Sequence, residues 1–338
     1  MEATLSSRRH IRATAAALAA TALVTAWIAL ALGGARTALW VDDASTPLAA
    51  ALALWFCVRA RSRHRGRMRL HWTLLSAATA CWMLAEVIWA LYALILVRAV
   101  PTPSWADLGY LSAIPLAAAA LVVHPGARRQ AAHTIRSVLD GFVVATSLLF
   151  LSWTLVLGPV SHGTDLSSIQ GAVTVAYPFG DVVIVFFIIV AIRGMDGGRT
   201  SLWYLFAGLL AMALSDSLYS YLTEIGNYAS SGAHVIDAGW VAAYLGIALS
   251  GWSAAGPPGP VRRQEQSRPP LASLVLPLAP VLIALFVTAI EIRTGHHLGS
   301  TTFVLAVALV ALVLVRESLL LRELLGPALP SAREAMQR

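Results

Sequence analysis

The chain has 338 residues, of which 58% are hydrophobic and only 12% charged, and its mean hydropathy is +0.73. Soluble domains usually carry about a quarter charged residues, so these values exclude an ordinary soluble protein, a disordered chain and a nucleic-acid-binding domain. The net charge is +7, and all 24 basic residues are Arg. The composition therefore predicts an integral membrane protein whose first partner is the lipid bilayer.

Ten apolar segments are predicted to cross the membrane, since a helix needs about 20 apolar residues to cross about 30 Å of hydrocarbon. The second segment is the weakest because it is short and follows Asp42 and Asp43. Pro47 would suit its first helical turn, where a missing N–H has no partner to lose. The predicted spans are Thr14–Leu32, Ala44–Val58, Trp72–Val97, Leu108–Val123, Val138–Val160, Gly171–Ile192, Leu202–Leu222, Val235–Trp252, Leu271–Ile292 and Thr301–Val315.

The Arg residues are distributed unevenly over this map. One side carries 21 of the 24, and only Arg36, Arg98 and Arg293 lie on the other side. Because cytoplasmic loops carry the excess of positive charge, both termini are predicted to be cytoplasmic, in a multi-pass protein of the cell membrane. We therefore expect a ten-span membrane domain over residues 1–315, followed by a cytoplasmic exit helix and tail over residues 316–338.

Two stretches of the chain are similar to each other. Residues 84–89 (LAEVIW) match residues 214–219 (LSDSLY), with an acid at the third position of each. A second acid follows the first after 21 residues in both copies, Asp107 in one and Asp237 in the other. The second motif reads DLGY (residues 107–110) in one copy and DAGW (residues 237–240) in the other.

An aromatic residue follows each of these four acids by three positions. Residues three apart lie on one face of a helix, so each acid is expected beside a ring. The pattern predicts a parallel internal duplication that relates residues 82–123 to residues 212–253. Coincidence is the alternative, because the match covers few residues.

Several carboxylates lie inside predicted spans, where insertion costs roughly 2.5–3.5 kcal/mol for an Asp at the helix centre. Ionisable residues at such depth indicate a functional site. We interpret them as one polar pocket that opens to the outside, in which rings beside carboxylates suit a cationic or hydroxyl-rich ligand. The residues predicted to line it are Glu86, Trp89, Asp107, Tyr110, Tyr177, Asp181, Asp216, Tyr219, Asp237 and Trp240.

A structural interpretation of the same acids stays open at this point. Each carboxyl group would then be protonated, or satisfied by Ser, Thr, Tyr and Trp side chains of neighbouring helices. Asp107 and Asp237 would be helix caps, where a carboxylate accepts free backbone N–H groups.

Catalytic and metal-binding patterns are absent from the sequence. It contains no phosphate-binding loop, no Gly-rich dinucleotide turn, no nucleophile elbow and no zinc-protease motif, so we predict no enzymatic activity and no cofactor. His162, His234, His296 and His297 lie on the predicted outer side, near Asp165, Asp237 and Glu291. Their spacing matches no common metal site, and no metal is predicted.

The segment after the tenth span keeps a helical pattern. Residues 316–325 (RESLLLRELL) place charged pairs six positions apart beside an apolar stripe, which is typical of an amphipathic signalling helix. Gly326-Pro327 ends it, and residues 330–334 (PSARE) match a capping box. We expect Arg316–Arg338 to bind a cytoplasmic signalling partner; the alternative is a plain end of the last span.

Two motifs carry a resemblance to a known family. Residues 103–111 (PSWADLGYL) and residues 176–181 (AYPFGD) are similar to motifs of polytopic membrane regions in actinobacteria that precede GGDEF-type diguanylate cyclase and EAL-type phosphodiesterase domains. The likeness covers roughly residues 70–325. It implies a sensory or regulatory membrane module, but no cyclase or phosphodiesterase sequence follows, so that chemistry is not carried over.

The sequence as a whole predicts an all-α polytopic bundle with a duplicated core. Its expected function is that of a sensor-like or regulatory module without a catalytic domain, with a ligand pocket of acids and rings. The alternative is a small-molecule or ion-coupled transporter, because buried acids and internal duplication also fit transport.

Overall fold

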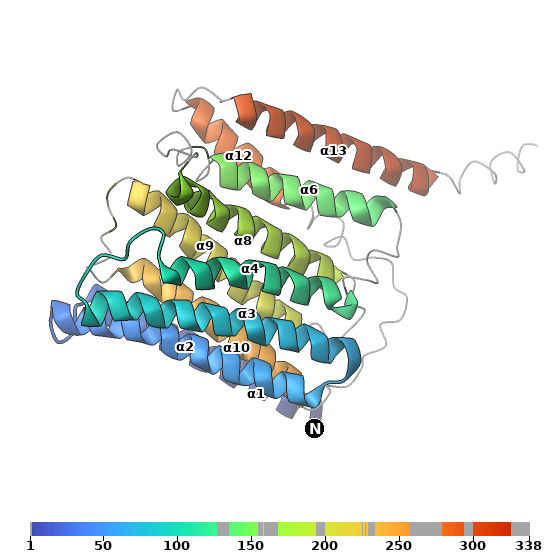
Figure 1. Ribbon diagram of the computed structural model, residues 1–338. Coiled ribbons are helices and arrows are strands. Elements are labelled where there is room, and N and C mark those ends of the chain that lie inside the picture. Colours follow the sequence, from blue (N-terminus) through green and yellow to red (C-terminus); the bar gives the residue numbers. More distant parts are fainter. Residues whose placement is uncertain are drawn as a thin grey trace, which may run out of the picture. The chain divides into compact units, whose positions relative to one another are not determined.

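The computed structural model describes residues 2–126, 135–154, 158, 168–193, 200–224, 226, 228, 234–256, 279–293 and 300–325. Within these ranges the protein is helical throughout and contains no strand (Figure 1). The chain divides into two compact units. The first contains Met1–Gln130 and Leu155–Glu265, and the second contains Ala131–Thr154 and Gln266–Arg338.

The first unit holds most of the long helices of the described chain. Two short elements adjoin them: the π-helical turn η1 (Leu91–Ile95) continues α3, and the 3₁₀ turn η3 (Val235–Asp237) leads into α10. The long helices are α1 (Glu2–Ala29), α2 (Ala35–Arg63), α3 (Gly66–Ala90), α4 (Trp105–Val123), α8 (Ile169–Arg193), α9 (Thr200–Glu224) and α10 (Ala238–Ala255).

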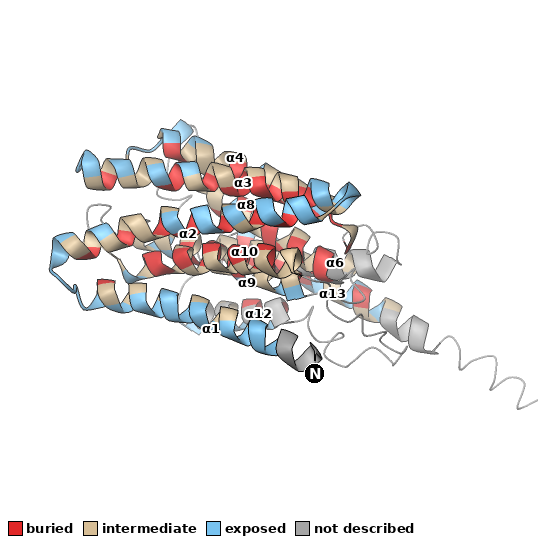
Figure 2. Ribbon diagram, turned by 90° about the horizontal axis from the view of Figure 1, so that it is seen from below, coloured by how far each residue is buried: buried red, intermediate tan, exposed pale blue. Residues whose placement is uncertain are grey.

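Six of these helices form a closed ring. In ring order they are α2, α3, α4, α8, α9 and α10, and α10 packs back against α2. The ring consists of two successive three-helix segments, α2–α3–α4 and α8–α9–α10, which meet where α4 packs on α8 and where α10 packs on α2. Helix α1 packs against α10 and α2, and its surface is mostly exposed (Figure 2).

Small side chains let the ring helices approach closely, as is usual between membrane helices. Ala50 and Ala53 of α2 and Ala117 of α4 are fully buried in the core of the unit. Gly251 of α10 lies so near α2 that an added Cβ would come 2.7 Å from the backbone of Phe56. The ring is therefore closed by backbone proximity as well as by larger apolar side chains.

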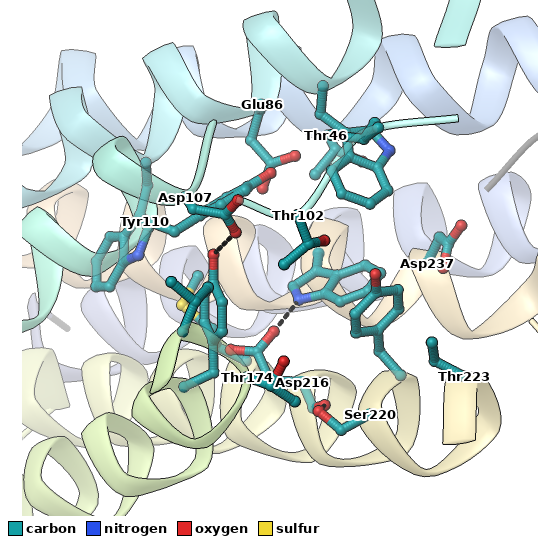
Figure 3. A pocket seen from close by; sticks show the side chains of 18 of the residues that line it. Thr46, Glu86, Thr102, Asp107, Tyr110, Thr174, Asp216, Ser220, Thr223 and Asp237 are labelled. Atoms are coloured by element: carbon teal, nitrogen blue, oxygen red, sulfur yellow. Dashed lines mark hydrogen bonds between the residues drawn. The ribbon is translucent and has the colours of Figure 1, made fainter. Parts of the chain in front are cut away.

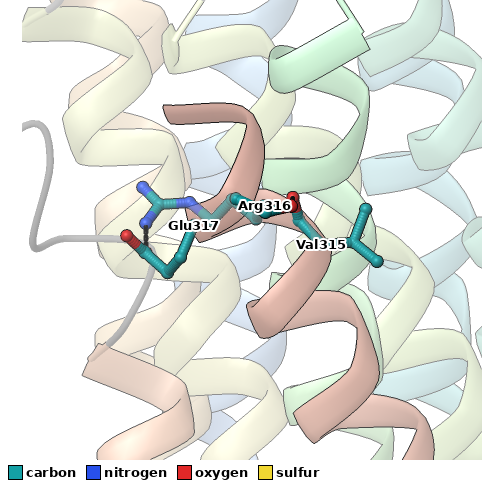
Figure 4. A network of polar contacts seen from close by, with 4 residues as sticks. Val315, Arg316 and Glu317 are labelled. Atoms are coloured by element: carbon teal, nitrogen blue, oxygen red, sulfur yellow. Dashed lines mark hydrogen bonds and ion pairs between the residues drawn. The ribbon is translucent and has the colours of Figure 1, made fainter. Parts of the chain in front are cut away.

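The second unit contains α6 (Ile135–Ser152), α12 (Ala279–Arg293) and α13 (Ser300–Leu325), with α6 packed against the other two. Val143 and Phe150 of α6 lie at its core. Helix α6 thus stands between the two ring segments in the sequence but belongs to a different unit. On α13 the Arg316 side chain is buried, and its guanidinium group contacts the carboxylate of Glu317 (Figure 4).

Eight of the described helices are long and apolar enough to cross a membrane, which confirms the prediction of a multi-pass membrane protein. Each of the ten predicted spans overlaps a described helix. Helices α6 and α12 are not among the eight, and the first residues of the ninth predicted span, 271–278, lie outside the described residues. The count of ten spans therefore stays a prediction.

Helix α2 differs from the predicted second span. It begins at Ala35, so Asp42 and Asp43 lie within the helix and Pro47 lies in its interior. The expectation that Pro47 belongs to a first turn was wrong. Proline weakens a helix interior locally, but here packing against α3 and α10 holds α2 on both sides of it.

The predicted exit helix is the continuation of α13, which runs without interruption from Ser300 to Leu325. The predicted tail and its capping-box motif, residues 326–338, lie outside the described residues.

Candidate functional site

A cavity of about 230 Å³ lies within the helix ring of the first unit. All ten residues that the sequence predicts for a pocket border this one cavity, and all six ring helices contribute to its wall. Figure 3 shows Glu86, Asp107, Asp216 and Asp237 projecting toward a common space from α3, α4, α9 and the start of α10.

The cavity lies toward one end of the ring. Glu86 and Asp216 belong to the later turns of α3 and α9, whereas Asp42 and Asp107 belong to the early turns of α2 and α4. The opposite end of α2 is Arg63, which lies about 30 Å from Asp42 along the helix at 1.5 Å per residue. The acids and the Arg-rich turn after α2 therefore occupy opposite ends of the ring.

Glu86 is held from across the cavity. Its side chain is only 7% exposed, and its Oε1 accepts a hydrogen bond of 2.7 Å from the Tyr244 hydroxyl of α10. The Tyr110 hydroxyl of α4 is a second hydrogen-bond partner. A buried carboxyl group costs much less free energy when such donors satisfy it, so the two tyrosines fix Glu86 in place.

Asp216 has the corresponding arrangement on the other side of the ring. Its Oδ1 accepts a 2.6 Å hydrogen bond from the indole N–H of Trp240 (Figure 3). Trp240 therefore contacts the first acid of its own hairpin, as Tyr110 contacts Glu86. These contacts join two different helices, whereas the predicted pairing was of each acid with the ring three positions later on its own helix.

Asp107 both caps a helix and lines the cavity. Its Oδ2 accepts hydrogen bonds from the backbone N–H (2.6 Å) and hydroxyl (3.0 Å) of Ser104, which completes a capping box at the start of α4. Its Oδ1 accepts a 2.5 Å hydrogen bond from Tyr177 of α8. Asp107 therefore caps α4 and also lines the cavity.

Asp237 is not a side-chain cap of α10. It accepts hydrogen bonds of 3.1 and 3.3 Å from the Tyr228 hydroxyl, and its carboxyl group is also hydrogen-bonded to that of Asp42. The backbone N–H of His234 donates to Asp42 at 2.9 Å. Burial and the neighbouring Asp237 carboxylate raise the pKa of Tyr228, so its hydroxyl remains a donor.

Two carboxyl groups of the cavity are incompletely satisfied. The Oδ2 atoms of Asp181 and Asp43 are buried and have no hydrogen-bond partner among the described residues. Both residues line the cavity, Asp181 from α8 and Asp43 from α2. Unpartnered buried polar atoms are rare in native proteins and need an explanation such as an ion, water or ligand.

Aromatic rings form a continuous cluster beside the acids. Tyr219 is its centre: its ring centroid lies 4.8 Å from that of Tyr228, 5.9 Å from that of Trp240 and 6.2 Å from that of Trp89, in edge-to-face geometry. Tyr228 also stacks on His234 at 4.2 Å. Edge-to-face contacts of this kind fix the rings relative to one another.

The positions that line the cavity recur along the sequence. Every lining residue of α3 and α4 has a lining counterpart 130 positions later, on α9, η3 or α10. The pairs are Trp82 and Met212, Glu86 and Asp216, Trp89 and Tyr219, Asp107 and Asp237, Tyr110 and Trp240, and Ile114 and Tyr244.

The contact between the two helices of each hairpin is also equivalent. An added Cβ on Gly109 would come 2.9 Å from the Cβ of Ala85, and one on Gly239 would come 2.1 Å from the Oγ of Ser215. Gly109 and Gly239 correspond in the two stretches, as do Ala85 and Ser215.

Sequence reasoning missed several lining residues. Asp42 and Asp43 were taken to precede a short span, although they face the cavity from within α2. Tyr244 could have been found, because it follows Asp237 by seven positions and so lies on the same helix face. Tyr228 carries no signal in the sequence that distinguishes it from an ordinary loop residue.

The lining residues define what the cavity can hold. Seven carry carboxyl groups, and none of the described ones is Arg or His. No group of three His, Cys, Asp or Glu residues in the described part of the chain could hold a metal ion; of the histidines considered above, His162, His296 and His297 lie outside that part. Comparison with protein families, with curated proteins and with solved structures finds no match to this chain.

Proposed function

We propose that this protein is a sensor-like or regulatory membrane module that binds a small ligand in the cavity of its helix ring. The observation that carries the proposal is that ten acids and rings, scattered over five helices and 154 residues of sequence, border one cavity. Four of the acids have local hydrogen-bond partners, as the structural interpretation requires. That interpretation gives no reason for them to surround a common space with two unpartnered carboxyl oxygens.

The cavity faces the outside of the cell in this proposal. The acids lie at the end of the ring away from the Arg-rich turn that follows α2. Placement of positive residues on the cytoplasmic side then puts both termini and the α13 extension in the cytoplasm. The protein would receive its ligand from outside the cell membrane.

The ring is proposed to derive from a duplication of three helices, α2–α3–α4 and α8–α9–α10. Exchanging the two segments leaves the order of packing in the ring unchanged. The paired lining residues and the equivalent glycine contacts support the same relation. The predicted correspondence of residues 82–123 with residues 212–253 lies within it.

Output is proposed to pass through the α13 extension and the tail, Arg316–Arg338, to a cytoplasmic signalling partner. The continuation of α13 to Leu325 supports a helical connector. The resemblance of residues 103–111 and 176–181 to membrane regions that precede cyclase and phosphodiesterase domains points to the same class of function. The module itself is proposed to have no catalytic activity.

A transporter is the second candidate, and the duplicated arrangement around a central cavity favours it, since many transporters bind substrate between two repeats. The two candidates differ in what happens to a bound compound. A sensor binds it without net movement, whereas a transporter carries it across a sealed membrane.

Ligand-dependent thermal unfolding of the purified full-length chain tests the proposal, because a compound that binds only the folded state raises its stability. We expect at least one compound in a panel of small metabolites to raise the unfolding temperature of the wild-type protein. The same compound should fail with Glu86→Gln or Asp216→Asn. A stabilising compound that accumulates inside proteoliposomes would favour transport, and a panel without any cavity-dependent effect would overturn the binding proposal.

A further inference from the structure

The inference drawn here rests on the proposed function and concerns the chemistry of the ligand. We propose that the cavity binds a small organic dication, with one ammonium group in each half of the ring and an aliphatic chain between them. Three properties of the cavity carry this assignment: its charge, its rings and its duplicated lining.

The charge of the lining favours a cation. Carboxyl groups are present on five of the six ring helices and at the start of the sixth, while the described lining contains no basic side chain. Asp42 and Asp237 are partners of each other, and Asp42 also accepts from the backbone N–H of His234. Asp43 and Asp181, by contrast, each keep a buried oxygen without a hydrogen-bond donor. Ammonium groups carry several N–H donors and no acceptor, which is what these oxygens lack.

The rings favour an organic cation over a bare metal ion. The ring centroid of Tyr219 lies 6.2 Å from that of Trp89 and 5.9 Å from that of Trp240, whose indole N–H donates to Asp216. Aromatic faces attract ammonium groups and their alkyl substituents. A metal ion would instead require several oxygen or nitrogen ligands converging on one point, and the described residues offer no such group.

The duplicated lining favours two ammonium groups rather than one. One half of the cavity offers Glu86, Asp107 and Tyr110, and the other half offers Asp216, Asp237 and Trp240 at the equivalent positions. A ligand with the same charged group at both ends can use both sets. At roughly 10–15 Å³ for each water-sized group, the cavity of about 230 Å³ has room for a short diamine.

Binding of three matched probes to the full-length chain in detergent, at constant ionic strength, tests the assignment. The probes are 1,4-diaminobutane, 1-aminobutane and 1,4-butanediol, which share a four-carbon chain and differ in their ammonium groups. We expect the diamine to bind at least about tenfold more tightly than the monoamine, because each charge-assisted hydrogen bond adds affinity. The diol should produce no shift in unfolding temperature.

Two cavity variants and one control variant test whether the diamine binds in the cavity. Glu86→Gln and Asp216→Asn keep the shape and hydrogen-bonding capacity of each side chain but remove its charge. Each should weaken diamine binding at least about tenfold. Glu317→Gln, on α13 and not among the lining residues of the cavity, should bind like the wild type. If one cavity variant fails to fold, the other still tests the assignment.

Failure of this inference is distinguishable from failure of the proposed function. Equal binding of diol and diamine, with loss in the cavity variants, would overturn the dication and leave a ligand cavity in place. Diamine binding that is unchanged in both cavity variants, or absent from the wild type, would also overturn it. Only the additional absence of cavity-dependent binding by any compound would remove the proposed function.

Discussion

The indole ring of Trp89 and the phenol ring of Tyr219 meet edge to face across the cavity, with centroids 6.2 Å apart and an interplanar angle of 80°. The two residues are 130 positions apart in the chain, the same separation that relates the other paired lining residues. Equivalent residues of two repeats touch each other only close to the axis that relates them. If the proposed duplication is real, its pseudo-two-fold axis is expected to pass close to this contact.

An experimental structure would test this axis directly. Superposition of residues 82–123 on residues 212–253 is expected to bring Glu86 onto Asp216 and Gly109 onto Gly239, with the two hairpins in the same orientation. A superposition that leaves the acids in unrelated surroundings would contradict the duplication. It would not affect the cavity itself.

Alanine substitutions at Gly109 and Gly239 should lower stability in both hairpins, but only one of the two losses should be reversible by a second substitution. Gly109→Ala and Gly239→Ala should each lower stability by about 1–3 kcal/mol, because overpacking forces neighbours apart. Replacing Ser215 by Ala should rescue much of the Gly239→Ala effect, since its hydroxyl oxygen is the group in the way at 2.1 Å. Unfolding in detergent measures both changes.

The Gly109→Ala variant should be harder to rescue than the Gly239→Ala variant. Its new Cβ would also meet the backbone carbonyl of Cys81 at 2.9 Å, so Ala85→Gly cannot rescue it fully. Gly256→Ala serves as a milder comparison and should cost less, because its nearest neighbour would lie at 3.3 Å rather than at 2.9 or 2.1 Å. Equal rescue in both hairpins would show that the two contacts are not as described.

The Tyr244 hydroxyl should be energetically coupled to Glu86. Tyr244→Phe removes the 2.7 Å hydrogen bond and leaves a buried acceptor less satisfied, which costs about 1–3 kcal/mol. A double-mutant cycle with Glu86→Gln should give a coupling of about 0.5–3 kcal/mol. Tyr221→Phe, on the exposed surface of α9, is the matched control and should leave unfolding unchanged. Additive effects of Tyr244→Phe and Glu86→Gln would contradict the contact.

His124 should make stability depend on pH. Burial and the neighbouring ring of His71, 4.9 Å away, lower the pKa of His124 to about 3. Its Nδ1 also accepts a 3.1 Å hydrogen bond from the Gly126 N–H, which requires the neutral ring. Between pH 3 and about 6.5, the ordinary value, the unfolded state binds a proton that the folded state does not.

The contribution of His124 to the free energy of unfolding is therefore complete above about pH 6.5 and is lost as the pH falls toward 3. His124→Gln should therefore flatten the pH dependence of the unfolding temperature in this window. Parallel pH profiles would disprove the assignment.

Topology can be checked independently of the fold. Reporter fusions after Arg69, Arg136, Arg199 and Arg268 are all expected to report the cytoplasm, because the excess of Arg residues lies on that side of the ten-span map. A periplasmic signal at any of the four positions would break the ten-span map. Helices α6 and α12 are the segments that such a result would call into question.

Much of the ring could be predicted from the sequence because its helices are long and apolar, and because acids inside such helices stand out. The placement of a ring three positions after each acid, as Trp89 after Glu86, followed from helical spacing alone. The contacts of Tyr244 and Tyr177 with acids on other helices did not, since they depend on which helices are neighbours. The true start of α2 was missed because Asp42 and Asp43 argue against a membrane helix until their place in the cavity is known.

Helix α6 belongs to the second unit although it lies between the two ring segments in the sequence. The polypeptide leaves the ring after its first three-helix segment, contributes α6 to the second unit, and returns for the other three-helix segment. The same unit contains α13, which packs on α6. The two ring segments are thus joined in the sequence only by way of the unit that also contains α13.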